Sequence, residues 1–100
     1  MTGTQSEKLT IVKVGGAILE DAASLSAFLD RFVALPGLKI LVHGGGRAAT
    51  KLAERLGVES KLVEGRRITD AETLDIVTMV YGGLVNKNTV AALQARNCNA

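Results

Sequence analysis

The sequence predicts an α/β fold built on an open, mainly parallel sheet with helices on both faces. Two β-branched apolar runs, residues 9–14 and 39–43, each end in a glycine-rich loop, as buried strands that enter tight turns do. Apolar residues at helical spacing follow each run, so the order is strand, helix, strand, helix. Such a unit has a right-handed crossover, which brings the carboxyl ends of both strands to the same edge of the sheet.

Two helices and a hairpin are predicted around and after the second strand. In residues 22–35 the apolar side chains repeat at intervals of three and four until a Pro-Gly pair stops the pattern. Residues 48–56 show the same spacing and are closed by a glycine, which commonly ends helices. Residues 61–68 then predict two short strands around a glycine turn.

The last helix is predicted to be long. Thr69 and Glu72 have the spacing of a capping box, in which the hydroxyl and the carboxylate bind free amides at a helix start. The apolar pattern then continues to Leu93, interrupted by Gly82 and Gly83, and a glycine costs about 1 kcal/mol against alanine in a helix interior. We therefore expect either that another backbone packs closely against this pair or that the helix bends there.

Length and composition indicate one small globular domain. The 100 residues are 47% hydrophobic and 3% aromatic with a net charge of +2, which indicates neither disorder nor a nucleic-acid or membrane partner. A single Cys98 and a single His43 exclude an internal disulfide and a structural zinc site. Residues 1–8 predict a flexible polar tail and no secretory signal, so we expect a cytoplasmic protein. A chain this short should be marginally stable unless it dimerises or belongs to something larger.

Two glycine loops and a lysine at one sheet edge favour anion binding. Gly15 and Gly16 follow the first strand and residues 44–46 follow the second, so backbone amides and helix N-termini would converge on a phosphate or carboxylate. One such loop could merely turn the chain, whereas two at one edge favour binding. Lys13 interrupts an apolar strand that we expect to be covered on both faces, where burial of an unpaired ammonium is costly. Its side chain should therefore reach an anion at the loop edge. Alternatively, if this is an edge strand, the side chain extends to solvent.

The hairpin arginines and the histidine are weaker candidates. Arg66 and Arg67 follow the hairpin turn and could close over the crevice to hold a carboxylate with two hydrogen bonds, although such pairs are commonly solvated. His43 has no acid or nucleophile tied to it in the sequence, so we expect it to organise its loop by hydrogen bonding.

Two other classes of function stay open on this basis. Gly44, Gly46 and Ala49 fit a dinucleotide-binding fingerprint, with Glu64 placed to hold a ribose, although that fingerprint normally follows the first strand. It would also leave Lys13 unexplained. A catalytically silent homodimerisation module built on the long helix is the third class.

The combination of motifs resembles the amino-acid kinase family over residues 9–100. The motifs that carry the resemblance are Lys13-Val14-Gly15-Gly16, His43-Gly44-Gly45-Gly46 and Gly65-Arg66-Arg67-Ile68-Thr69, with Asn86-Lys87 in the long helix. The first motif alone suggests the superfamily. The other two narrow the resemblance to kinases of acylated amino acids, above all those that act on N-acetyl-L-glutamate in arginine biosynthesis.

The resemblance implies a reaction and a role for each matched residue. ATP, which carries its own Mg²⁺, would transfer its γ-phosphoryl group to the side-chain carboxylate of N-acetyl-L-glutamate, N-succinyl-L-glutamate or an acylated aminoadipate. No protein metal site is implied. By this resemblance Lys13 would be catalytic, and Gly15 and Gly16 would bind the nucleotide phosphate. Gly16, Gly45 and Gly46 would bind the transferring phosphoryl group and the acceptor. Arg67 would bind the α-carboxylate of the acceptor amino acid.

The resemblance also implies what this chain lacks. Family members continue into a carboxyl-terminal lobe that binds the nucleotide, so residues 9–100 would form the amino-terminal lobe and would be inactive alone. A homodimer through the helix over residues 69–97 is expected. Residues 1–8 are too short for the amino-terminal helix that links arginine-inhibited members into hexamers, so the dimer should be insensitive to arginine.

Overall fold

The computed structural model describes residues 8–59 and 61–100, and of Arg67 only the backbone. The expected tail therefore lies outside the described residues, except for Lys8. The elements in chain order are β1 Leu9–Val14, α1 Gly16–Glu20, α2 Ala22–Ala34, β2 Leu38–His43, α3 Gly46–Arg55, β3 Lys61–Val63, β4 Arg66–Ile68, α4 Ala71–Thr78, the π-helix η1 Met79–Val85 and α5 Asn86–Gln94. The α/β prediction is confirmed, and the short helix α1 is an addition to it.

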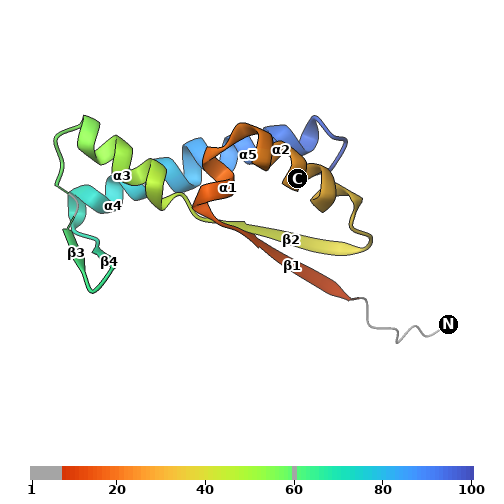
Figure 1. Cartoon of the computed structure of the whole chain (residues 1–100), viewed down its shortest axis with the longest axis horizontal. Helices are drawn as coiled ribbons and strands as arrows, with labels where there is room; N and C mark the ends of the chain where they lie inside the picture. The colour runs from red at the N-terminus through yellow and green to blue at the C-terminus, as the bar shows by residue number, and fades with distance from the viewer. Residues whose placement is uncertain (1–7, 60) are drawn as a thin grey trace.

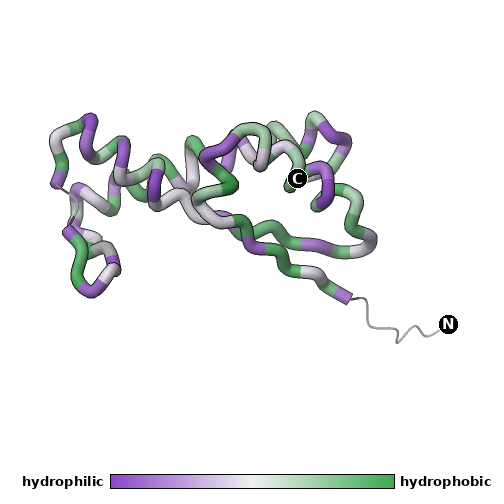
Figure 2. Tube along the Cα trace, viewed as in Figure 1, coloured by the Kyte–Doolittle hydropathy of each residue, from purple (hydrophilic) through white to green (hydrophobic). Residues whose placement is uncertain are grey.

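Strands β1 and β2 pair in parallel. Lys13 lies beside Val42 and Val14 beside His43, so both strands end at the same edge and the two glycine loops leave the sheet together (Figure 1). The predicted strand-helix-strand unit is therefore confirmed. Hydrophobic residues, green in Figure 2, lie along the length of both strands, in agreement with the two apolar runs in the sequence.

Helices α1, α2 and α5 lie over one face of this sheet (Figure 1). On that face, buried Leu29, Phe32 and Leu93 pack with half-buried Val12 and Leu41. No described residue covers the other face of the sheet, where Ile11 and Ile40 are 63% and 46% exposed. This one-sided arrangement differs from the expected helices on both faces, because the crossover between two neighbouring parallel strands places its helices on a single side.

A second core lies beyond the sheet, between α3 and the long helix. Ala49 and Ala53 of α3 are buried against Ile76 and Val80. The small side chains let the two helices approach closely, and the apolar spacing predicted for residues 48–56 is confirmed. Gly57 ends the pattern with φ +74°, a conformation that glycine adopts at little cost.

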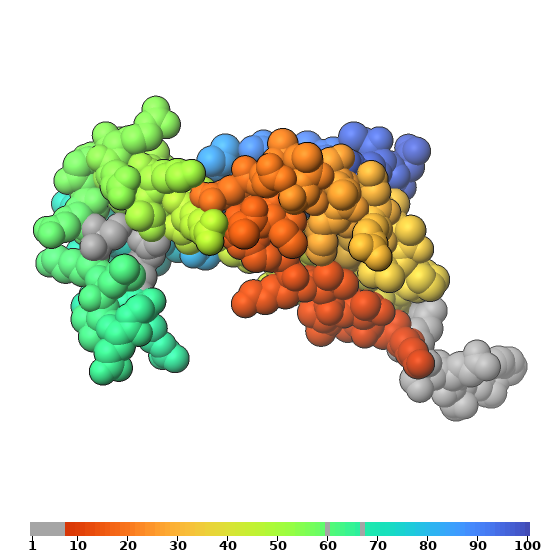
Figure 3. Space-filling view, in the orientation of Figure 1, coloured from red at the N-terminus to blue at the C-terminus, as the bar shows by residue number. Residues whose placement is uncertain are grey.

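The hairpin of β3 and β4 projects from the body of the molecule (Figure 3). Its strands pair antiparallel, and the turn uses Glu64 and Gly65 with φ of 51° and 77°, as a two-residue turn between twisted strands requires. The hairpin prediction is confirmed. Leu62 and Val63 are more than half exposed, so little packing holds the hairpin in place.

Asp70, and not Thr69, caps helix α4. Its carboxylate accepts a hydrogen bond from the Thr73 N–H at 2.8 Å, and this bond holds the pKa of Asp70 below its usual value of 3.8. The predicted capping box of Thr69 and Glu72 is therefore wrong by one position. Aspartate caps at least as well as threonine, and the helix begins at Ala71.

The long helix does not stay an α-helix throughout. Residues Met79–Val85 form a π-helix between α4 and α5, and Gly82 and Gly83 lie within it. A side-chain carbon added at either glycine would meet no atom within 4 Å from beyond the adjoining helix backbone. The glycines therefore coincide with a local widening of the helix, and the close backbone approach that we considered does not occur among the described residues.

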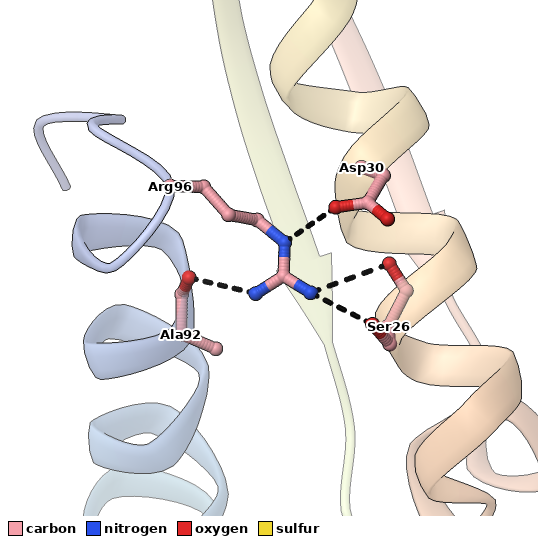
Figure 4. Close-up of polar contacts among 4 residues, drawn as sticks. All are labelled: Ser26, Asp30, Ala92 and Arg96. Atoms are coloured by element: carbon pink, nitrogen blue, oxygen red, sulfur yellow. Dashed lines mark hydrogen bonds and ion pairs between the residues drawn. The ribbon is translucent and has the colours of Figure 1, made fainter.

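Arg96 joins the end of the long helix to α2 (Figure 4). Its guanidinium binds Asp30 at 2.8 Å and donates to the Ser26 hydroxyl at 2.9 Å, while Nη1 donates to the Ala92 carbonyl at 3.0 Å. These bonds fix α5 above the sheet core. The bonds to Asp30 and Ser26 were not predicted, because they join residues 66 and 70 positions apart.

The molecule is elongated. Its radius of gyration is 16.6 Å, against about 13 Å for a compact domain of this length. The elongated shape and the uncovered sheet face agree with the expectation that a dimer partner or the rest of a larger protein stabilises this chain. None of the helices in the described ranges combines the length and apolar character needed to cross a bilayer.

Candidate active site

The carboxyl edge of the sheet carries both glycine loops. Gly15 is the N-cap of α1 and Gly45 the N-cap of α3, and no side chain caps either helix. The amides of the first turn of α3 thus lie where a bound anion would meet them. The structure brings together the glycines that we predicted at this edge.

Lys13 lies next to the end of β1 and is exposed. Successive side chains alternate across a strand, so Lys13 is on the uncovered face while Val14, 1% exposed, packs under the helices. The expected burial is therefore wrong for this chain. In the described part of the chain no carboxylate lies within ion-pair distance of the Lys13 ammonium, which leaves this group available to an anion.

Gly45 occupies a conformation that other residues rarely adopt. It is buried, with φ 153° and ψ 16°. A side-chain carbon at this position would lie 3.1 Å from Tyr81 Cδ1 and 3.2 Å from Val85 Cγ2. Both backbone conformation and space therefore require glycine here.

His43 holds the second loop by hydrogen bonds, as predicted. Its Nδ1 lies 2.9 Å from the Gly44 carbonyl oxygen and its Nε2 lies 3.0 Å from Asn86 Oδ1. Because a carbonyl only accepts, Nδ1 carries a proton and donates it. The contact with Asn86 spans 43 residues and was not predicted, although Asn86 belongs to one of the motifs.

A cavity of about 310 Å³ lies on the helix side of the loops. Gly16 and Gly45 line it, together with the basic residues Arg47 and Lys51. Glu20 forms ion pairs with both, at 3.2 Å and 3.3 Å, and the hydrogen bond from Arg47 is the main cause that lowers the pKa of Glu20. Neither basic residue was predicted, although their i, i+4 spacing after a glycine loop was visible in the sequence. Lys13 does not line this cavity.

The described residues of the hairpin that carries both arginines do not line the cavity beside the loops. Arg66 is exposed, the Arg67 backbone pairs with Leu62, and no described hairpin residue lines the cavity beside the loops. The expected closure over the crevice is therefore not seen for Arg66, and the Arg67 side chain lies outside the described structure. The physical reason is that the strands are three residues long and their apolar side chains stay largely exposed, so little packing among the described residues draws the hairpin toward the loops.

Comparison with known proteins gives the family. The model of the amino acid kinase family matches residues 8–100. This chain belongs to the amino acid kinase family. The resemblance inferred from the three motifs is therefore confirmed, and the family does not favour the dinucleotide interpretation of Gly44, Gly46, Ala49 and Glu64.

The two relatives described next, which are highly identical to this chain, are both named acetylglutamate kinase. The acetylglutamate kinase of Bacteroides fragilis is 64% identical over 100 residues, which are all of this chain and 38% of that protein. The acetylglutamate kinase of Bacteroides thetaiotaomicron is 68% identical over 94% of this chain and 37% of that protein. This amino acid kinase chain thus spans little more than a third of the length of these relatives.

A solved structure shares the fold of this amino acid kinase chain. The crystal structure of smu.665 from Streptococcus mutans UA159 matches with a TM-score of 0.73 and 26% identity, over 89% of this chain and 37% of that one. The parallel sheet and its helices are thus those of a known architecture.

Proposed function

We propose that this chain forms the acceptor-binding lobe of an acetylglutamate kinase, as part of a longer enzyme of arginine biosynthesis. The observation that carries the proposal is the parallel register of β1 and β2, in which Lys13 and both glycine loops share one edge. Two relatives above 60% identity bear the name acetylglutamate kinase, which supports the choice of substrate.

The reaction needs few chemical groups from the protein. An oxygen of the side-chain carboxylate of N-acetyl-L-glutamate attacks the γ-phosphorus of ATP, the bond to the β-phosphate oxygen breaks, and ADP and an acyl phosphate leave. Mg²⁺ enters with ATP as part of the substrate. Because charge builds on the transferring group, preorganised positive charge and amide donors lower the barrier.

Each candidate residue has a place in this scheme. Lys13 stabilises the transferring phosphoryl group, and Gly15 and Gly16 approach the nucleotide phosphate. The amides at Gly45 and Gly46, at the start of α3, hold the phosphoryl group and the acceptor carboxylate. The relatives extend far beyond the part that this chain matches, so in this proposal the rest of the enzyme supplies the nucleotide lobe and the 100 residues alone do not turn over.

A direct assay tests the proposal. The full-length enzyme is incubated with ATP and N-acetyl-L-glutamate, N-succinyl-L-glutamate or N-acetyl-L-aminoadipate, and both ADP and the acyl phosphate, trapped with hydroxylamine, are measured. We expect N-acetyl-L-glutamate to have the highest kcat/KM. Absence of acyl phosphate with all three acceptors contradicts the proposal, and tight binding of a nicotinamide dinucleotide would favour the alternative.

Arg67 is proposed to bind the α-carboxylate of the acceptor. The change Arg67→Lys keeps the charge and removes the paired donors of the guanidinium, so we expect KM for N-acetyl-L-glutamate to rise about tenfold or more while KM for ATP stays within about twofold. Steady-state kinetics with each substrate varied in turn measures this difference. Arg55→Lys, at the exposed end of α3, is the control. Equal effects on both substrates would indicate a folding defect and contradict the role.

The long helix over residues 69–97 is proposed to form a homodimer. Met79 and Leu84 are 54% and 57% exposed, and a side-chain carbon at Gly82 or Gly83 would meet no atom within 4 Å beyond the adjoining helix backbone. A partner helix could therefore approach closely there and bury apolar surface that a small domain needs to cover.

Analytical ultracentrifugation of the full-length protein tests the dimer. We expect a dimer at micromolar concentration, and Gly82→Leu or Gly83→Leu should shift it toward monomer, because this chain itself leaves room for the new side chains. Ala27→Leu, on the exposed side of α2, is the control. A monomeric or hexameric wild type, or a dimer that both glycine variants leave intact, would contradict the proposal.

A further inference from the structure

We infer that Asn86, at the end of the π-helix, is a positioning residue that sets the direction of the Gly45 amide through His43. The inference rests on the proposed function, since it concerns the loop to which the acceptor and the transferring group are assigned. Asn86 touches no substrate in this scheme. It acts through the histidine and the loop.

Contacts from one helix segment hold the loop at two points. The Asn86 carboxamide lies 3.0 Å from His43 Nε2. The ring of Tyr81 and the side chain of Val85 lie against Gly45, so close that a side-chain carbon there would be 3.1 Å and 3.2 Å from them. The π-helix therefore provides the apolar support of the loop, and Asn86, the residue that follows it, provides the polar anchor.

The widened helix explains how one segment can make all these contacts. Asn86 is five positions after Tyr81, and in an α-helix such a residue points about 140° away around the axis. A π-helix bonds each residue to the fifth one along and so returns it to the same side. The contacts from Tyr81, Val85 and Asn86 to one loop thus depend on the π conformation of Met79–Val85.

Peptide geometry carries the effect from His43 to the amide. Nδ1 of His43 donates to the Gly44 carbonyl at 2.9 Å. In a planar trans peptide the C=O and the following N–H point in opposite directions, so fixing the Gly44 oxygen also fixes the direction of the Gly45 N–H. A carboxamide suits the other ring nitrogen, because it can offer either a donor or an acceptor to Nε2.

The test replaces Asn86 in the full-length enzyme. Asn86→Leu has a similar shape without hydrogen-bonding groups. We expect kcat to fall about 10–100-fold, because a slightly misdirected amide donor no longer meets the developing charge. KM for ATP should stay within about threefold of the wild-type value. The backbone amide signal of Gly45 in ¹⁵N NMR should shift as well. Gln94→Leu removes an amide group from the exposed end of the same helix and should leave kcat and the Gly45 signal unchanged.

Several results would overturn the inference. They are an unshifted Gly45 amide signal, a kcat within about twofold of wild type, or a loss of kcat that only follows a loss of folded protein in thermal unfolding. If Asn86→Leu does not fold, Asn86→Ala is judged by the same measurements. Failure of the wild type to phosphorylate N-acetyl-L-glutamate would contradict the proposed function alone, because the Gly45 amide signal does not depend on catalysis.

Discussion

Replacing Lys13 with alanine in the full-length enzyme is expected to lower kcat about 10²–10³-fold, the loss seen when one preorganised donor to a developing charge is removed. Lys13 is exposed beside the loop edge, and none of the described carboxylates forms an ion pair with it. Its charge is therefore available to the phosphoryl group. Because the effect is on the transition state, KM for either substrate should change by less than kcat.

Steady-state kinetics with both substrates varied measures this loss. Lys8→Ala is the matched control, since Lys8 is also exposed but precedes the opposite end of β1. A Lys13→Ala enzyme with wild-type kcat and poor ATP binding would show that Lys13 only binds the nucleotide. That result would contradict its catalytic role.

Replacing Gly45 with alanine should be as damaging, for a different reason. The residue has φ 153°, and its new methyl group would press on Tyr81 and Val85 at 3.1 Å and 3.2 Å. The loop must then move, and displacement of its amides should lower kcat about 10²–10³-fold. Strain of this kind costs about 1–3 kcal/mol, so the melting temperature of the full-length protein should also fall.

Gly44→Ala is the control for stability. A side-chain carbon at Gly44 would meet nothing within 4 Å, so this variant should keep the wild-type melting temperature. Thermal unfolding and kcat are measured on both variants. A Gly45→Ala enzyme with wild-type kcat would show that the buried glycine is not needed for the shape of the loop.

Prediction from sequence succeeded where the signal is local. The strand over residues 9–14, the helix over residues 22–35 and the hairpin over residues 61–68 follow from apolar spacing and turn residues, and each matches its element within one or two positions. The cap of α4 was misplaced by one residue, because Thr69 and Asp70 are adjacent and both can cap a helix.

The candidate site was predicted only in part. Gly15, Gly16, Gly45 and Gly46 gather at one edge because parallel pairing dictates it. The prediction for Lys13 was wrong in its burial, because cover on both faces of the strand was expected and the described residues cover only one. Arg67 and the proposed dimer stay predictions, since the first depends on a side chain outside the described structure and the second on a partner.

The sequence by itself determined the α/β class, the order of the elements, the common edge of the two loops and the family, because these depend on local periodicity and on motifs that few families share. Only the tertiary structure decided that the helices cover one face, that the long helix widens at Met79–Val85, and that Asn86 reaches His43. The physical reason is that these features depend on contacts between residues distant in the chain. Their energies outweigh local preference but leave no periodic signal in the sequence.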